Sequence, residues 1–346
     1  MASPRARNSW LAATAALTFA LGSAALAVAA PAAIAVPYHG DGLIAYSVKT
    51  GIYAVRADGT GSRLLVPWQP STCGNGCVVW KVPRNPRYSP DGRRLTYDLE
   101  TNIVHKGVGS IQTNTLTVYV ADANGQHRRR IGLGHNPEFS PDGKEVIYLL
   151  NPDAYPKPPT EEIEPPEPLG EDYGPMEAVN IETAARRRLP VSGAPEFSPD
   201  GTEMLTERQL KLSDGVHAGV TVENLDGTHS QFFEASAFPR FYAAHPRFTD
   251  DSEFSYDCPS LDNRQPDMCL FNTLTRHHQR LFHVHEFWAV EAASSPSGRR
   301  FAISGLQGLY VTDARGHHPR LIVRNGSGAN YVQSDVPTSP DWQPIG

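Results

Sequence analysis

The stretch PRYSPDGRRLTYD at residues 86–98 decides the fold, because close copies of it return along the chain, first as PEFSPDGKEVIYL at 137–149. Four further copies, PEFSPDGTEMLT, PRFTDDSEFSYD, SSPSGRRFAIS and TSPDW, begin at Pro195, Pro246, Ser294 and Thr338. The serine or threonine of the copies falls at 89, 140, 198, 249, 295 and 339. A repeat of roughly 45–58 residues predicts a propeller whose blades are four-stranded sheets.

Each copy has the composition of two short strands joined by a tight turn. In the first copy the turn is Ser89-Pro90-Asp91-Gly92, in which proline presets φ, aspartate bonds nearby backbone and glycine adopts a positive φ. Leu95-Thr96-Tyr97 then follows as a β-prone run. We therefore expect these copies to supply the first two strands of each blade.

A second type of hairpin alternates with these copies. It is an apolar strand, a polar turn that often contains Asp and Gly, and a strand rich in Arg and Leu, as in IYAVRADGTGSRLL. Its six examples span residues 52–65, 117–132, 178–189, 220–233, 269–282 and 309–323. One unit of each type gives four strands per repeat, so the sequence predicts six blades.

The two ends of the repeat array are complementary. The array opens near Leu43–Tyr46 with the last three strands of a blade, and it closes around Val336–Trp342 with a first strand. We therefore expect the C-terminal strand to pair with the strand near Ile44. Such closure removes free sheet edges that an open array leaves exposed. The sequence thus predicts an all-β fold, a six-bladed β-propeller closed by pairing of its N- and C-terminal strands.

These copies resemble the repeats of the TolB-type β-propeller family. The resemblance rests on PRYSPDGRRLTY, PEFSPDGKEVIY, the IYAVRADGTGSRLL-type hairpins and the terminal SPDWQP, and it covers residues 42–344. It implies a six-bladed propeller that is used mainly for protein–protein contact in the bacterial envelope. The motif is specific for the fold and says little about function.

Residues 1–35 differ in composition from the rest of the chain. Two arginines precede an apolar run from Trp10 to Ala29, which ends among small-x-small cleavage candidates. This pattern predicts a secretory signal peptide, with the propeller spanning 36–346 and the mature protein periplasmic or secreted. The alternative is a membrane anchor that stays attached, since about 20 apolar residues span a bilayer. After removal of the signal, no membrane span is expected.

The four cysteines of an exported chain predict two disulfides. Cys73 and Cys77 lie in the short CGNGC loop, and Cys258 and Cys269 flank a polar loop between two expected strands. Neighbouring strands bring such residues close enough to bond. We favour the pairs Cys73–Cys77 and Cys258–Cys269 over the other pairings. A metal site is the alternative, although Cys258 and Cys269 lack the close spacing usual for paired thiolate ligands.

The long, irregular segments between strands all fall at one end of the expected blades, which we call the loop-bearing face. Loops held on a rigid scaffold commonly carry binding residues, so we expect binding there. Aromatic side chains, which are enriched at protein interfaces, gather in the same segments. The candidates are Trp68, Trp80, Phe238, Phe241, Tyr242, Trp288 and Tyr331. The alternative is that these rings form small cores within the loops.

The innermost strands of a propeller surround an axial channel, and one position just before each turn motif is expected to line it. In chain order the residues at this position are Asn85, Asn136, Ala194, His245, Glu291 and Asp335. Their polar groups suit a divalent cation or a small polar ligand. The alternative is that they hydrogen-bond neighbouring blades and channel water. No other cofactor is expected.

His283 and His285 form the densest titratable cluster in the sequence. Alternation places both on one side of an extended segment, and with His245 they form a candidate metal site at the channel mouth. The chain has 13 histidines, so chance pairs are common. A metal-assisted polysaccharide lyase or glycan hydrolase at the channel mouth is therefore the alternative function.

The sequence contains no G-x-S-x-G nucleophile elbow and no glycine-rich phosphate loop. Its formal net charge of −6 becomes about −8 without the signal segment, which disfavours nucleic acid as a partner. We therefore expect a non-enzymatic, monomeric scaffold that binds another envelope or secreted protein.

Overall fold

The computed structural model describes residues 40–73, 77–105, 111–151, 175–212, 215–234, 244–258, 267–282, 291–305, 307–325 and 337–345. All of them belong to one compact unit, Ala33–Gly346. The expected signal segment 1–35 lies outside the described residues. Within the described ranges every regular element is a strand, and no helix has the length and hydropathy needed to cross a bilayer.

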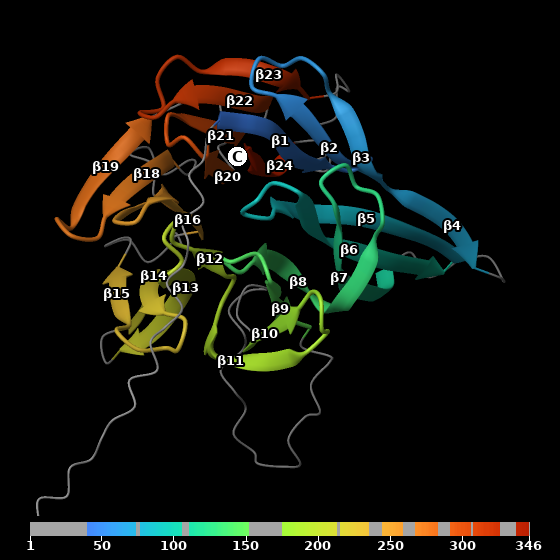
Figure 1. The fold of residues 1–346 in the computed structure, drawn as a ribbon, viewed down its shortest axis with the longest axis horizontal. Coiled ribbons are helices and arrows are strands. Elements are labelled where there is room, and N and C mark those ends of the chain that lie inside the picture. The colour runs from blue at the N-terminus through green and yellow to red at the C-terminus, as the bar shows by residue number, and fades with distance from the viewer. Residues whose placement is uncertain are drawn as a thin grey trace, which may run out of the picture. The chain divides into compact units, whose positions relative to one another are not determined.

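The first sheet joins the two ends of the described chain. Its spatial order is β24 (Thr338–Ile345), β1 (Gly40–Val48), β2 (Gly51–Arg56) and β3 (Arg63–Pro67). β24 runs antiparallel beside β1, with Ile44 opposite Trp342 and Ala45 opposite Asp341 (Figure 1). The expected pairing of the C-terminal strand with the strand near Ile44 is therefore confirmed.

The remaining strands form one long sheet and three short ones. The long sheet contains, in sequence order, β4 (Gln69–Cys73), β5 (Cys77–Tyr88), β6 (Arg94–His105), β7 (Ile111–Asp122), β8 (Arg129–Phe139), β9 (Glu145–Leu150), β10 (Pro175–Asn180) and β11 (Arg186–Ser192). The second contains β12 (Glu196–Phe197), β13 (Glu203–Leu212), β14 (Gly215–Asn224) and β15 (Gln231–Glu234). The third contains β16 (Ala244–Asp250), β17 (Glu253–Cys258), β18 (Asp267–Asn272) and β19 (His277–Phe282). The fourth contains β20 (Glu291–Ser294), β21 (Arg300–Gly305), β22 (Gly308–Asp313) and β23 (Arg320–Arg324).

The described strands thus form four separate four-stranded sheets and one eight-stranded sheet, not the six separate sheets that the sequence predicted. The difference arises at β8, where no loop separates the last strand of one repeat from the first strand of the next. Its residues 129–133 pair with β7, and its residues 134–139 pair with β9. One continuous strand therefore serves two neighbours and joins their sheets.

The core lies between the faces of neighbouring sheets. The first sheet uses both of its faces: Ala54 and Leu65 pack with Tyr97 of the long sheet, and Ile44 packs with Leu309 of the β20–β23 sheet. Trp342 on β24 is 3% exposed, and its Nε1 donates a hydrogen bond to the Ala293 carbonyl oxygen at 3.1 Å. β24 is therefore fixed by packing as well as by strand pairing.

The expected turn chemistry is present in the first repeat copy. Gly92 has a φ of 67°, and its N–H donates to the Ser89 carbonyl oxygen at 2.8 Å. Asp91 Oδ1 accepts hydrogen bonds from Ser89 Oγ at 2.6 Å and from the Arg93 N–H at 3.0 Å. Partial burial acts to raise the pKa of Asp91, but these hydrogen bonds outweigh it and leave the pKa below its usual value. Ser140–Asp142 and Ser198–Asp200 repeat this arrangement.

Replacing Asp91 by alanine should lower the free energy of unfolding by about 1–2 kcal/mol, because Ser89 Oγ and the Arg93 N–H lose their acceptor. Urea unfolding at neutral pH measures the effect. Ser297→Ala is the matched control, since Ser297 holds the same turn position and its hydroxyl lies 3.1 Å from the Ser295 hydroxyl, while its backbone N–H, which alanine keeps, donates to Asp41 Oδ1 at 3.2 Å. Equal losses in the two variants would show that the aspartate does not stabilise the turn.

The sixth repeat copy, TSPDW, is not a turn. Residues 338–342 lie entirely within β24, and Ser339 has a φ of 50°. Strand pairing places Ser339-Pro340-Asp341-Trp342 where the first copy has Asn85-Pro86-Arg87-Tyr88. The resemblance of the letters S-P-D to the turn motif is therefore misleading at this position.

Candidate functional site

Bulges in three inner strands turn one side chain of each toward a common cavity. Asn85 in β5, Asn136 in β8 and Ser339 in β24 have φ values of 50°, 48° and 50°, and the pairing register shifts at each of these places. Asparagine is enriched in this left-handed region, and a bulge re-aims the side chain of its strand. The side chains are thereby directed away from the regular pleat.

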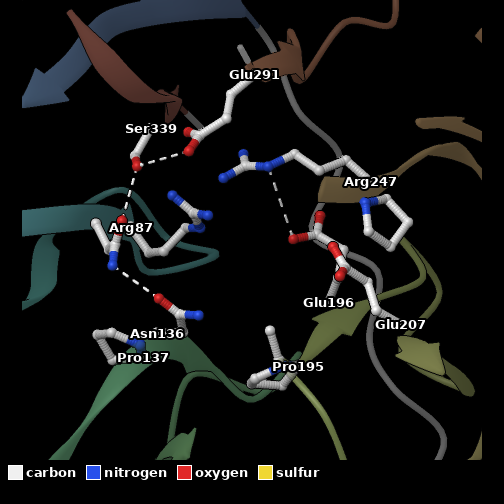
Figure 2. Close-up of a pocket in the computed structure, with 12 residues that line it drawn as sticks. Arg87, Asn136, Pro137, Pro195, Glu196, Glu207, Arg247, Glu291 and Ser339 are labelled. Atoms are coloured by element: carbon white, nitrogen blue, oxygen red, sulfur yellow. Dashed lines mark hydrogen bonds and ion pairs between the residues drawn. The ribbon is translucent and has the colours of Figure 1, made fainter. Parts of the chain in front are cut away.

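These residues line a cavity of about 140 Å³, which we call the axial cavity (Figure 2). Its walls come from the inner strands of all five sheets and from the segments that lead into them. The lining residues are Asn85, Arg87, Asn136, Pro137, Ala194, Pro195, Glu196, Glu207, Pro246, Arg247, Glu291 and Ser339. Asn85, Asn136, Ala194 and Glu291, which the sequence places just before the turn motifs, thus lie in the wall of this cavity, and their role in binding stays a prediction.

The polar residues at the position before each turn motif, which we call the polar column, form a hydrogen-bonded chain along one wall of the axial cavity. Ser339 Oγ donates to Asn85 Oδ1 at 2.7 Å and lies 3.3 Å from Glu291 Oε1. Asn85 Nδ2 donates to Asn136 Oδ1 at 2.7 Å and to Asp98 Oδ2 at 2.8 Å. Asp98 is fully buried, and its burial raises the pKa of the carboxyl. The wall thus ties four inner strands together across β20, β24, β5 and β8.

The structure assigns the sixth place in this column to Ser339, whereas the sequence assigned it to Asp335. Asp335 lies outside the described residues. Counting back from the apparent turn serine of TSPDW leads to Asp335, but Ser339 is itself the column residue, as its bulge and hydrogen bonds show.

Two positions after the column residue, each of five inner strands carries a charged side chain that was not predicted from the sequence. We call Arg87, Glu138, Glu196, Arg247 and Asp341 the charged ring. Arg87 Nε lies 3.1 Å from Glu138 Oε2, and Arg247 Nη1 lies 3.3 Å from Asp341 Oδ1. The contact from Arg247 Nε to Glu196 Oε2 is longer, at 4.0 Å. Figure 2 shows both guanidinium groups pointing into the axial cavity from opposite sides.

The carboxyl groups of the charged ring are held in an environment that favours their neutral form. Burial, followed by the neighbouring Glu196 carboxylate, raises the pKa of Glu138 well above its usual value. Burial also raises the pKa of Glu196 and of Asp341, although the Arg247 guanidinium opposes both shifts. Three carboxyl groups share two guanidinium groups, so among the described ring residues the acids are in excess.

The signal for this ring is present in the sequence. The second residue before the turn serine or threonine reads Arg, Glu, Glu and Arg in the first four copies, at residues 87, 138, 196 and 247. Charged residues in strands are usually solvated, so this pattern alone does not indicate burial. Only the placement of these strands around one cavity shows that opposite charges meet.

Of the predicted binding aromatics, the structure describes Trp68 and Trp80. Trp68 precedes β4 and is 39% exposed, and Trp80 lies on β5 opposite Pro70. The others, Phe238, Phe241, Tyr242, Trp288 and Tyr331, lie outside the described residues. The same is true of His283 and His285, while of His245 only the backbone, in β16, is described.

The cysteines and candidate metal ligands are described in part. Cys77 and Cys269 are each disulfide-bonded, and Cys73 faces Cys77 across the β4–β5 hairpin. The pairing of Cys258 with Cys269 stays a prediction. Among the residues that the structure describes, no group of three or more His, Cys, Asp or Glu residues could hold a metal ion.

Antiparallel sheets whose inner strands surround one polar cavity define a β-propeller, and the fold is TolB-like. TolB from Acinetobacter baumannii aligns with a TM-score of 0.56 and 14% identity, covering 89% of this chain and 68% of that chain. Putative TolB from Agrobacterium tumefaciens gives 0.52 and 12%, covering 88% and 100%. A chain of the nidogen/laminin complex gives 0.52 and 9%, covering 87% and 98%. At these identities the likeness establishes the fold alone.

No protein-family model matches the chain, and no curated protein matches it.

Proposed function

We propose that this protein is an exported β-propeller scaffold that binds another envelope or secreted protein through its loop-bearing face. The observation that carries the proposal is an extension of the long sheet at that face. β5, β6 and β7 each have 12 residues, against four to six for β20, β21 and β22. The added length pairs β5 with the edge strand β4, whose residues 69–72 are exposed. Such a ribbon presents both backbone groups and side chains to a partner.

Trp68 is the described side chain best placed to anchor a partner on this extension. Among the described residues it is one of five exposed large hydrophobic side chains, at 39% exposure, and it directly precedes β4. Tryptophan is enriched among residues that dominate binding energy at interfaces. The disulfide-bonded state of Cys77, at the tip of the same ribbon, fits an oxidising compartment outside the cytoplasm.

We further infer that the eight-stranded sheet represents two blades joined through β8, which gives six blades in total. The support comes from packing across β8. Val118 and Val120 of β7 form one buried cluster with Val146 and Tyr148 of β9. The cluster also contains Ile131 and Phe139 of β8, between the two strands, and it supports a bend of the sheet at β8. An experimental structure with a flat eight-stranded sheet would contradict this count.

Trp68→Ala should reduce capture of the partner from an envelope fraction by about tenfold, as expected for loss of a binding anchor. Quantitative pull-down with the mature protein as bait measures it, followed by calorimetry with the purified partner. Leu274→Ala is the matched control, because Leu274 is 81% exposed but lies in the turn between β18 and β19, at the other end of the strands. Loss of capture in both variants, or in neither, would remove the support for the loop-bearing face.

A further inference from the structure

The axial cavity contains a buried cationic group that lacks one acceptor. The Arg247 side chain is 8% exposed, its Nη1 lies 3.3 Å from Asp341 Oδ1, and its Nε lies 4.0 Å from Glu196 Oε2. Its Nη2 atom makes no hydrogen bond within the described chain. Figure 2 shows the guanidinium group pointing into the cavity. Because buried donors nearly always have an acceptor, the cavity calls for an oxygen atom at this place.

Arg87 places a second guanidinium group in the same cavity, opposite Arg247 (Figure 2). Its Nε lies 3.1 Å from Glu138 Oε2, and its Nη1 donates to the Pro86 carbonyl oxygen at 2.9 Å. Two guanidinium groups that face one space repel each other, and an oxyanion between them offsets that repulsion. Carboxylates also match the planar donors of arginine and make charge-assisted hydrogen bonds with them. A carboxylate is therefore the acceptor that suits this cavity best.

The same cavity also has carboxyl groups in its wall, so a simple anion does not suit it. Glu196, Glu207 and Glu291 line it together with the two arginines, and acids are in excess among these described residues. Glu196 makes the longest ion-pair contact in the charged ring, at 4.0 Å, and its side chain retains 20% exposure. Burial raises the pKa of Glu196, and an ammonium group beside it would oppose that rise. The ligand should therefore carry a positive group as well as a carboxylate.

The size of the cavity and the spacing of its charged groups favour a small molecule with adjacent charges. The volume of about 140 Å³ is much larger than the roughly 10–15 Å³ that one water needs. Arg247 Nε and Glu196 Oε2 are 4.0 Å apart, so a small ligand that reaches both side chains must carry its two charges close together. An α-amino acid does so, because one carbon bears both its ammonium and its carboxylate group. Pro137, Pro195 and Ala194 provide apolar wall for a short side chain.

We propose that the axial cavity binds a small free α-amino acid. Its carboxylate accepts a hydrogen bond from Arg247 Nη2 and faces Arg87, while its ammonium group donates to the Glu196 carboxylate. The apolar part of the wall leaves room for a side chain as short as that of alanine. This site goes beyond the scaffold function proposed above, because it lies among the inner strands and not on the β4–β5 ribbon.

The test titrates the mature, disulfide-intact protein with glycine and L-alanine at pH 7 and follows binding by NMR. Propionate, which lacks the ammonium group, and L-alaninamide, which lacks the carboxylate, should bind at least about tenfold more weakly than L-alanine, because each leaves one buried charge unmatched. Glu196→Gln should weaken L-alanine by about tenfold, since a partly buried charge pair is lost. Glu182→Gln is the control, because it removes the same charge from an exposed turn. Arg247→Lys, which keeps a positive charge but removes Nη2, should weaken L-alanine similarly, provided that urea unfolding shows the variant to be folded.

Three outcomes would overturn the proposal. If neither glycine nor L-alanine shows saturable binding, the cavity holds water alone. If propionate or L-alaninamide binds as tightly as L-alanine, the site recognises a single charge and not an amino acid. If Glu196→Gln leaves the affinity for L-alanine unchanged, the amino acid binds elsewhere. None of these measurements involves the protein partner, so they can fail without affecting the scaffold proposal, and the pull-down with Trp68→Ala can fail without affecting this one.

Discussion

Replacing Gly92 by alanine is expected to destabilise the protein by about 3 kcal/mol or more, whereas the same change at Gly298 should cost about 1 kcal/mol. Both glycines hold the same place in a repeat turn, and both have a φ of 67°. The strain of an alanine at positive φ is therefore common to the two variants. Their surroundings differ: a Cβ on Gly92 overlaps the Pro344 carbonyl oxygen of β24, while a Cβ on Gly298 meets nothing within 4 Å.

The difference between these variants isolates the contact that ties the C-terminal strand to the first SPDG turn. The Gly92 carbonyl oxygen accepts a hydrogen bond from Gln343 Nε2 at 2.8 Å. Nearby, the Tyr88 N–H donates to Asp341 Oδ2 at 2.8 Å. An alanine Cβ at position 92 overlaps β24 and should displace this strand. The displacement lengthens both of these hydrogen bonds and so weakens them.

Urea unfolding of Gly92→Ala and Gly298→Ala measures the two costs directly. Hydrogen exchange provides a second readout, because amides of β24 should lose protection in Gly92→Ala and keep it in Gly298→Ala. If the two variants unfold at the same urea concentration, β24 does not depend on the turn, and closure rests on its pairing with β1 alone.

Features that depend on a few neighbouring residues could be predicted from the sequence, whereas features that depend on the register of strand pairing could not. The SPDG turns were predictable because proline, aspartate and glycine act on their own backbone within four residues. The column residues Asn85, Asn136, Ala194 and Glu291 followed from the spacing to those turns. Ser339 was misassigned because its letters match the turn motif, while its place is set by its neighbours Thr338 and Asp341, which pair with Ser47 and Ala45 of β1.

The charged ring shows why a pattern present in the sequence was not sufficient, because the residues that meet in it are far apart in the chain. Arg247 and Asp341 are 94 positions apart, yet they form an ion pair. Nothing in the local composition of either strand indicates that partner. The eight-stranded sheet joined through β8 was also unpredictable, because it depends on the absence of a loop between residues that pair with different neighbours.

Arg247→Leu is expected to lower the free energy of unfolding by about 3–5 kcal/mol at pH 7, because it leaves buried carboxylates without their partner. Arg247 contacts Asp341 at 3.3 Å and Glu196 at 4.0 Å, and its own side chain is 8% exposed. Arg187→Leu is the matched control. Arg187 Nη2 lies 2.6 Å from Glu145 Oε2, but its side chain is 52% exposed, so its loss should cost less than about 1 kcal/mol.

The pH dependence separates loss of charge pairing from loss of packing. Each carboxyl of the charged ring, at Glu138, Glu196 and Asp341, has a pKa raised in the folded state, so the folded protein binds protons more tightly than the unfolded chain. Their contribution to stability therefore increases as pH falls from their raised pKa values toward the ordinary carboxyl range near pH 4. Without Arg247 these pKa values rise further, so the variant should regain more stability on acidification than the wild type does.

The turn aspartates set the lower limit of that window. The pKa of Asp91 and of Asp142 is lowered in the folded state, so their contribution is present above the ordinary value and is lost as pH falls through the lowered one. Unfolding of wild type, Arg247→Leu and Arg187→Leu should therefore be compared between pH 7 and pH 5, above the range where the turns weaken. A deficit for Arg247→Leu that stays constant over this interval would mean that the arginine contributes by packing, and that the acids of the charged ring are already neutral at pH 7.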